Sequence, residues 1–189
     1  MADNLTPPQR HLNMSHIHGK DTEIELLVRK RLHADGFRYR VNAKELPGKP
    51  DILLPRYRTV IFVNGCFWHG HKGCKLFVVP QTNTGFWTTK IERNRARDDE
   101  MFRQLEALQW NVAVVWECEL RESRVDATIA KLEATIRKNG ERWAKEKADR
   151  RLYRKEYSSR MRQIKERAVF KIKGGIKPMG ISPSSNNIP

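Results

Sequence analysis

The chain has 189 residues, enough for one domain with a buried core, and its net charge of +15 favours nucleic acid or another polyanion as its partner. It contains no run of about 18 apolar residues, which argues against a membrane-spanning helix. The N-terminus lacks the apolar region of a secretion signal, and three cysteines suit a reducing compartment better than a disulfide framework. We therefore expect a cytoplasmic protein without membrane association.

Residues 1–20 combine two prolines with mostly polar residues and predict an arm with at most one or two helical turns. A loosely docked terminus is the simplest interpretation of this segment. The first helix is expected to begin at Thr22, because Thr22 and Glu25 have the spacing of a capping box in which the glutamate reaches back to the amide of the cap residue. Gly36 predicts its end.

Residues 37–41 alternate apolar and basic side chains, which is typical of a strand with one exposed face. Two apolar runs, at 52–54 and 59–63, predict two further strands that a short turn joins into a hairpin. This hairpin would bring Asp51, which precedes the first run, close to Asn64 at the end of the second.

A polar loop precedes a helix that we expect from about residue 88 to 108, with a basic first half. An apolar strand at 111–116 and an amphipathic helix at 123–138 follow. This alternation of helices with buried strands predicts an α/β fold with a central mixed β-sheet flanked by helices.

Beyond residue 140, many Lys, Arg and Glu residues predict a solvated helix to about residue 173, followed by a disordered end rich in Gly, Pro, Ser and Asn. Residues 121–189 contain 19 Lys and Arg against 8 Asp and Glu, so most of the net charge lies there. We divide the chain into an N-terminal arm (1–20), a central domain (21–139) and a basic C-terminal extension (140–189).

All three cysteines, together with one histidine, could form a single tetrahedral metal site. Cys66, His71 and Cys74 lie within nine residues, and Cys118 lies two residues after the apolar strand at 111–116. Three thiolates and one imidazole are a common ligand set of structural zinc sites. Cysteine is also common as a small core residue, and from spacing alone His69 could replace His71 as the ligand.

A second site could form around Asp51. A single aspartate after a proline is most often a turn or cap residue, but this one heads a buried strand next to the Cys/His-rich loop. A carboxylate with backbone oxygens suits Mg²⁺, which can polarise a phosphodiester and position the attacking water. His69 could act as general acid or base, and Glu25 could hold a metal-bound water, although its capping-box role explains it equally well.

Two aromatic pairs, Phe67-Trp68 and Phe86-Trp87, lie in segments that we expect to be loops. Core packing is the ordinary role of such residues. Exposed aromatic side chains next to a basic surface can instead stack on bases or wedge between base pairs and kink the duplex. The loop positions of Trp68 and Trp87 make this second interpretation as plausible as core packing.

Four blocks, LPGKPDILL, YRTVIFVNGCFWHGHKGC, TGFWTTKIERNRARDDE and VVWECEL, follow one another in an order and spacing that resemble the very short patch repair (Vsr) DNA mismatch endonucleases. The resemblance covers roughly residues 9–135. It implies a restriction-endonuclease-like fold and Mg-dependent nicking of the T-containing strand, 5′ to the T of a T:G mismatch that deamination of 5-methylcytosine leaves in double-stranded DNA. It further implies a bacterial, monomeric enzyme that works alongside a cytosine-5 methyltransferase and mismatch repair factors.

Matched positions imply the roles in catalysis and metal binding. Asp51 and the backbone carbonyl of Val63 would bind Mg²⁺, His69 would be the general acid or base, and Glu25 would hold a metal-bound water. The structural zinc would be held by Cys66, His71, Cys74 and Cys118. Asn64 occupies a position at which a family member has a second active-site histidine, so we keep it as a catalytic candidate and expect an altered rate rather than lost activity.

The resemblance also implies DNA contacts. The intercalating aromatics would be Phe67, Trp68 and Trp87. Met14 and Ile17 fall in the N-terminal arm, which would grip the DNA from the opposite groove. We add Lys90 and Asn94, on the predicted basic helix, as DNA-binding candidates.

The C-terminal extension has no counterpart in this resemblance. It could add salt-sensitive affinity by neutralising phosphates, or it could be a solvated tail. Two alternatives to the implied function stay open: a zinc-stabilised DNA-binding module without catalysis, and a nuclease of the same fold with another DNA specificity.

Overall fold

The computed structural model describes residues 9, 12 and 20–174, with side chains to residue 166. Two compact units can be distinguished, Met1–Trp143 and Ala144–Pro189. Met14 and Ile17, the predicted contacts of the N-terminal arm, lie outside the described residues. No helix in the described part of the chain is both long and apolar enough to cross a membrane.

The first unit is built on a four-stranded sheet with the order β1-β2-β3-β4. The strands β1 (Arg40–Val41), β2 (Ile52–Leu54) and β3 (Thr59–Asn64) are antiparallel neighbours, and β4 (Asn111–Trp116) runs parallel to β3. The predicted mixed sheet and the β2–β3 hairpin are thus confirmed. The first strand is shorter than the predicted 37–41, because the amide of Phe37 donates to the carbonyl of Leu32 and keeps this residue in the turn that ends the preceding helix.

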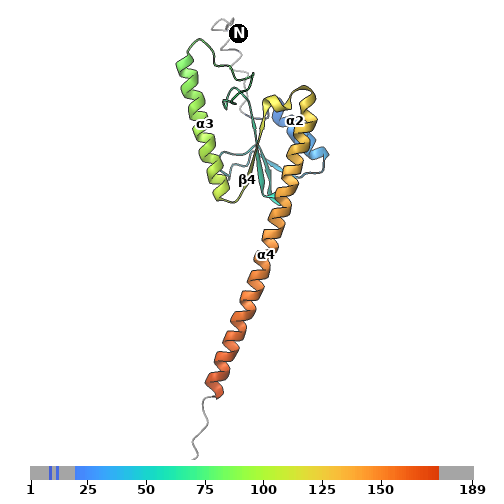
Figure 1. The fold of residues 1–189 in the computed structure, drawn as a ribbon, viewed down its shortest axis with the longest axis vertical. Helices are drawn as coiled ribbons and strands as arrows, with labels where there is room; N and C mark the ends of the chain where they lie inside the picture. The colour runs from blue at the N-terminus through green and yellow to red at the C-terminus, as the bar shows by residue number, and fades with distance from the viewer. Residues whose placement is uncertain (1–8, 10–11, 13–19, 175–189) are drawn as a thin grey trace, which may run out of the picture. The chain divides into compact units, whose positions relative to one another are not determined.

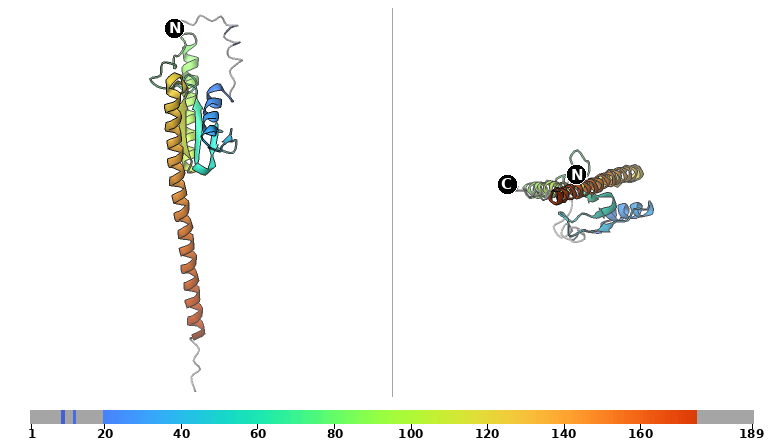
Figure 2. Two further views of the ribbon diagram at one scale, coloured as in Figure 1. Left: turned by 90° about the vertical axis from the view of Figure 1, so that its right-hand side faces the viewer. Right: turned by 90° about the horizontal axis from the view of Figure 1, so that it is seen from below.

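Three helices cover the two faces of this sheet (Figures 1 and 2). They are α2 (Glu23–Ala34), α3 (Thr84–Ala107) and the start of α4 (Val125–Gly174). Successive strand residues point to opposite faces and therefore join two different core clusters. The first cluster contains Ile52, Leu54, Ile61 and Val63 with Val28 and Leu32 of α2 and Ile129, Leu132 and Ile136 of α4. The second contains Leu53, Val60 and Phe62 with Leu105 of α3.

The turn of the hairpin is tied to the segment between α3 and β4. A short 3-10 helix, η1 (Pro55–Tyr57), leads to Arg58, whose guanidinium donates to the carbonyls of Leu108 at 2.6 Å and Gln109 at 3.1 Å. The same guanidinium lies 4.0 Å from the centre of the Trp110 ring. These contacts fix where β3 and β4 begin, and the parallel register then brings their ends, Asn64 and Trp116, side by side.

Helix α3 begins four residues before the predicted start, so Phe86 and Trp87 lie in its first turns and not in a loop. The amide of Trp87 donates to the carbonyl of Asn83 at 3.1 Å, and the Thr84 hydroxyl donates to the carbonyls of Pro80 and Gln81. These polar residues, which we predicted to form a loop, make the hydrogen bonds at the start of α3.

Helix α4 is continuous through Gly140, whereas the sequence predicted separate helices at 123–138 and beyond 140. A Cβ at Gly140 would lie 2.5 Å from the ring of Tyr57, so glycine is needed there for close packing and does not end the helix. Two short 3-10 helices, η2 (Glu117–Leu120) and η3 (Glu122–Arg124), connect β4 to α4.

Candidate functional site

A cluster of sulfur and imidazole ligands lies just beyond the ends of β3 and β4. Cys66 follows β3, His71 and Cys74 lie in the next loop, and Cys118 lies in η2. Their ligand atoms are all within 4.8 Å of one another. Nδ1 of His71 is 3.5 Å from Sγ of Cys66 and 3.3 Å from Sγ of Cys118, close to the separation of about 3.6 Å between N and S ligands of a tetrahedral zinc ion. The residues present therefore fit a tetrahedral metal, with His71 and not His69 in the set.

Neighbouring groups orient these ligands. The backbone amide of Cys118 donates to Sγ of Cys66, and the amide of Leu76 donates to Sγ of Cys74, each at 3.4 Å. The His71 ring stacks on Trp116 at a centroid distance of 4.1 Å with an angle of 3°. Burial raises the pKa of Cys66 to about 12 and also raises the pKa of Cys118, whereas the Leu76 amide lowers the pKa of Cys74. Metal binding at this cluster must therefore release protons.

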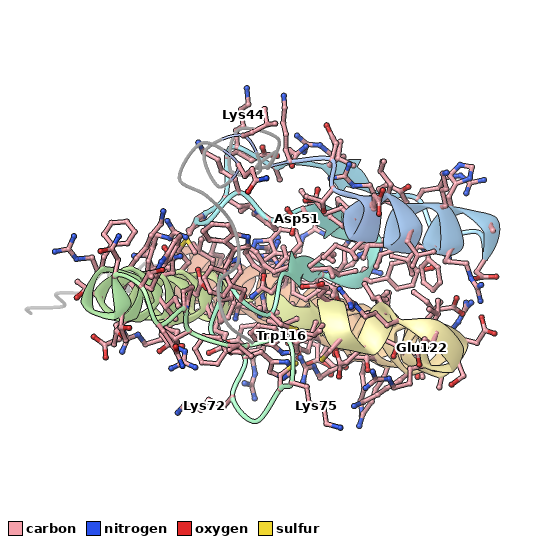
Figure 3. The ribbon with its side chains drawn as sticks, turned by 90° about the horizontal axis from the view of Figure 1, so that it is seen from above. Lys44, Asp51, Lys72, Lys75, Trp116 and Glu122 are labelled. Atoms are coloured by element: carbon pink, nitrogen blue, oxygen red, sulfur yellow. The ribbon has the colours of Figure 1, made fainter. Side chains whose placement is uncertain are left out.

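Beside the cluster lies a cavity of about 1370 Å³ between α2, the strand ends and α3. Figure 3 looks onto this end of the molecule, with Asp51 between α2 and the strands. The polar groups lining the cavity include Glu25, Asp51, Asn64, His69 and Asp98. Cationic side chains from α3 and from loops also line it: Lys20, Lys44, Lys49, Lys90 and Arg97. An acidic interior with surrounding cations suits a polyanionic ligand that meets a bound cation.

Asp51 lies where the hairpin argument predicted it, at the end of β3. Its Oδ2 accepts a hydrogen bond from the amide of Val63 at 2.8 Å. Burial raises the pKa of Asp51 to about 6, and the nearby charge of Glu25 adds to this, while the Val63 amide, Arg29 and His69 act in the opposite direction. A carboxylate whose negative charge is poorly solvated gains strongly from a divalent cation.

Three hydrogen bonds orient the carboxylate of Glu25. It accepts hydrogen bonds from the Asp21 amide at 3.0 Å, the Thr22 hydroxyl at 2.9 Å and the Arg29 guanidinium at 2.8 Å. Thr22 is the helix cap, as predicted, and accepts from the amide of Glu25. The predicted bond from the Thr22 amide to Glu25 is wrong, because the carboxylate reaches one residue further, to Asp21.

Arg29 is the buried partner of this acidic group, and sequence reasoning missed it. The side chain is buried, and its guanidinium also donates to the carboxylate of Asp21. Its Nε has no hydrogen-bond partner among the described residues. The spacing of four residues between Glu25 and Arg29 on a predicted helix was a usable signal, but it was lost among many basic residues.

His69 is held by an aspartate that the sequence did not indicate. Nδ1 of His69 lies 2.5 Å from Oδ2 of Asp98, a residue of α3 with an exposed fraction of only 7%. This contact uses Nδ1 and leaves Nε2 as the nitrogen that can exchange a proton with a ligand. Asp98 is one of several acidic residues on a helix of mixed charge, and its burial could not be read from the sequence.

Asn64 is buried at the end of β3, paired with Trp116 of β4, and lines the same cavity. Val63, immediately before it, is buried in the first core cluster. The strand therefore delivers the Val63 amide and the Asn64 side chain to the cavity one residue apart.

The two predicted aromatic pairs come together in one aromatic cluster. Phe67 lies 5.1 Å from Trp68 and 5.3 Å from Trp87 between ring centroids, and Phe86 lies 5.2 Å from Trp87. Phe86 is 59% exposed, and Nζ of Lys90 lies between 5.4 and 5.7 Å from three of these rings. The cluster thus combines apolar rings with a cation at the surface.

Asn94 and Arg95 of α3 fix the loop that carries these groups. The Asn94 amide donates to the carbonyl of Trp68 at 2.9 Å, and Arg95 donates to the carbonyl of Gly70. Gly70 has a φ of +61°, and a Cβ there would meet Arg95 and Ile91 within 2.6 Å. The loop between Cys66 and His71 therefore depends on glycine for its close approach to α3.

The structure is that of a mixed α/β protein in which a Cys/His cluster that could hold a metal lies next to a cavity. This cavity is lined by both acidic and cationic side chains. A family model described as DNA mismatch endonuclease Vsr matches residues 2–75. The chain is 45% identical over 137 residues to the type II nicking enzyme V.XorIIP of Xanthomonas oryzae pv. oryzae, covering 72% of this chain and 96% of the relative. It is 46% identical over 121 residues to the DNA mismatch endonuclease Vsr of Escherichia coli strain K12, covering 64% and 77%.

A third relative, the type II nicking enzyme V.NmeAIP of Neisseria meningitidis, is 47% identical over 125 residues, which cover 66% of this chain and 89% of the relative. The chain thus belongs to the Vsr family of DNA mismatch endonucleases and is a DNA endonuclease.

Proposed function

We propose that the protein nicks double-stranded DNA on the T-containing strand, 5′ to the T of a T:G mismatch that arises from deamination of 5-methylcytosine. The observation that carries this proposal is the meeting of Asp51, Glu25 and His69 in one cavity beside the aromatic cluster. The restriction-endonuclease-like fold, implied by the resemblance, is part of the same proposal and is consistent with the mixed sheet and its flanking helices.

Asp51 and the backbone carbonyl of Val63 would hold Mg²⁺, with Glu25 binding one of its waters. When bound, Mg²⁺ supplies polarisation of the scissile phosphodiester and orientation of the attacking water. The raised pKa of Asp51 and the proximity of Glu25 support a cation here, because two acidic groups in a cavity are relieved by positive charge.

His69 would move the proton. Its Nδ1 is held by Asp98, so Nε2 can accept a proton from the attacking water or donate one to the leaving oxygen. Asn64 would donate a hydrogen bond through its amide but cannot shuttle a proton, because an amide does not titrate near neutral pH. A single histidine would therefore serve this centre.

Phe67, Trp68 and Trp87 would wedge between base pairs at the mismatch, with Lys90 binding a phosphate nearby. Their rings lie together and could enter the duplex at one step. A T:G pair favours such an insertion, because it costs less to unstack than a matched pair. Asn94 would contact DNA beside these rings while its amide holds the carbonyl of Trp68 in place. Met14 and Ile17 of the N-terminal arm would grip the opposite groove.

Zinc is the metal that best suits the Cys/His cluster, since three thiolates with one imidazole in a closed tetrahedron favour it. Its role would be structural, because all four positions are taken by protein ligands. The enzyme would act as a monomer, in cooperation with a cytosine-5 methyltransferase that produces the methylated base and with mismatch repair factors.

The test is strand-specific nicking of duplexes with a central T:G, each compared with its matched T:A and C:G forms, with Mg²⁺ and with chelator. Nicking 5′ to the mismatched T alone, lost in Asp51→Ala while DNA binding persists, is the expected result. Tight binding without cleavage of any duplex would point to a DNA-binding module. Equal cutting of matched duplexes would retain the nuclease and discard mismatch specificity.

A further inference from the structure

The second unit of the chain carries a charge pattern that the endonuclease site does not use. Within it, α4 continues over residues 144–166 with every side chain exposed. This stretch contains nine Lys and Arg against four Asp and Glu. None of its residues is among those that line the cavity or form the Cys/His cluster or the aromatic cluster.

The cations and anions of this stretch lie on different sides of the helix. At 100° per residue, seven of the nine cations fall within an arc of about 140° that contains no acidic residue. We call this surface the basic face; its cations are Lys147, Arg150, Arg151, Arg154, Lys155, Arg162 and Lys165. The remaining two cations, Lys145 and Arg160, lie on the other side with the acidic residues Glu146, Asp149 and Glu156.

This segregation distinguishes the helix from an ordinary solvated one. A solvated charged helix is stabilised by mixing the two signs at spacings of three and four residues, as in the ion pair of Arg162 with Glu166 at 3.7 Å. Arg162 belongs to the basic face and is paired in this way, but most cations of this face have other cations as neighbours at these spacings, for example Lys147, Arg151 and Lys155. Such repulsion is relieved when a polyanion covers the face.

We propose that the basic face of α4 binds the phosphate backbone of duplex DNA, independently of sequence and outside the contacts made by the mismatch site. From Lys147 to Lys165 the helix spans about 27 Å, comparable with about eight base pairs. The proposal rests on DNA being the substrate of this endonuclease and not on which mismatch it recognises. The rest of the chain would recognise the lesion, and this helix would hold the enzyme on DNA.

The test uses full-length double variants that each remove one lysine and one arginine. Two change opposite ends of the basic face, K147Q/R151Q and R162Q/K165Q, and the matched control K145Q/R160Q removes the same charge from the other side. Glutamine keeps helix propensity close to that of Lys and Arg, and circular dichroism checks helix content. The affinity for a matched duplex is measured without Mg²⁺ across a series of salt concentrations.

Each lost phosphate contact lowers the slope of log K against log salt by about 0.9. We expect at least one basic-face variant to lose about 1.8 from the slope, so that its affinity loss between about 50 and 200 mM salt becomes about 12-fold smaller. The control should keep the wild-type slope. Equal changes in all three variants, or none in any, would overturn the proposal.

Nicking of T:G duplexes by the same proteins at low salt separates this inference from the proposed function. Because the variants leave the cavity intact, the single-turnover rate at saturating enzyme should equal that of the wild type. If the wild type nicks no mismatch but the basic-face variants still lose salt dependence, the proposed specificity fails and the basic face stands.

Discussion

Nδ1 of His69 lies 2.5 Å from Oδ2 of Asp98, and this contact joins the loop after β3 to helix α3. The two residues are 29 positions apart in the sequence. Because one nitrogen of the ring is fixed by a buried carboxylate, the tautomer and the direction of the other nitrogen are fixed as well.

Asp98→Asn should lower the single-turnover nicking rate by on the order of 10²-fold or more, because an amide can donate to Nδ1 and leave Nε2 protonated. The affinity for mismatched DNA should change little. The measurement is the nicking rate over a range of pH at saturating enzyme. Asp99→Asn, which changes an exposed neighbour, is the control; an equal effect of both changes would show that Asp98 matters only through charge.

Arg29→Gln should destabilise the protein by about 3–5 kcal/mol, since it leaves Glu25 and Asp21 without their buried cation. Arg29→Lys should recover only part of this, because an ammonium cannot bridge two carboxylates as the guanidinium fork does. Urea unfolding measures the change, with Lys30→Gln as the exposed control. A loss below about 1 kcal/mol would contradict the bridging role.

Asp51→Asn should stabilise the metal-free protein at neutral pH. Burial raises the pKa of Asp51 from its ordinary value of 3.8 to about 6, so the folded state binds more protons between these values and loses stability as pH rises from about 4 to 6. The wild type should therefore become less stable than Asp51→Asn by about 2–3 kcal/mol above pH ~6. Unfolding in urea with chelator at acidic and neutral pH measures this difference.

Added Mg²⁺ should have different effects on the stability of the wild type and of Asp51→Asn. Binding to the folded wild type should offset the cost of the buried charge and raise its stability, with little effect on Asp51→Asn. If the wild type instead gained stability relative to Asp51→Asn as pH rises from about 4 to 6, the pH dependence would have the opposite sign and would rule out the raised pKa.

His71→Ala and His69→Ala should separate the two sites. His71→Ala removes a ligand of the Cys/His cluster, so zinc content should fall and the melting temperature should drop by roughly 10 °C for a loss of about 3 kcal/mol. His69→Ala should retain zinc but lose nicking, and any fall in its melting temperature should come from Asp98 losing its partner and not from lost metal. Metal analysis and thermal unfolding decide this; zinc lost in His69→Ala and kept in His71→Ala would reverse the assignment.

Asn64→His should change the nicking rate and give it a new dependence on pH, because a titrating ring enters the cavity. Asn64→Ala should reduce the rate less than Asp51→Ala, since it removes a proposed hydrogen-bond donor and not the proposed metal ligand. Rates of the three variants under one set of conditions provide the comparison. Complete loss of nicking in Asn64→Ala would assign that amide an essential role.

The sequence predicted the strands and the Cys/His cluster because both depend on local signals. The apolar runs of β2 and β3 and the short spacing of Cys66, His71 and Cys74 constrain structure over few residues. Cys118 followed because it was the only remaining cysteine. The two wrong helix boundaries have other origins. At Gly140, packing on Tyr57 overrode local propensity, and at Thr84, local hydrogen bonds to the carbonyls of Pro80 and Gln81 begin the helix within a polar segment.

Asp98 and Arg29 could not be assigned from the sequence for a related reason. Each is one charged residue on a charged helix, and its role depends on its burial; Asp98 pairs with the distant His69, whereas Arg29 pairs with the nearby Glu25. Only the fold distinguishes Asp98 from its exposed neighbour Asp99. Paired groups far apart in the chain are therefore where structure adds most to this site.

The end of β3 contributes to both the cavity and the Cys/His cluster. Val63 and Asn64 line the cavity and Cys66 belongs to the cluster, with only Gly65 between them. A Cβ at Gly65 would already lie 3.3 Å from Trp68. An insertion or deletion of a single residue here would rotate one centre out of register with the other. Changes of chain length, in natural divergence or in engineering, should therefore be accepted after Cys74 and rejected between Val63 and Cys66.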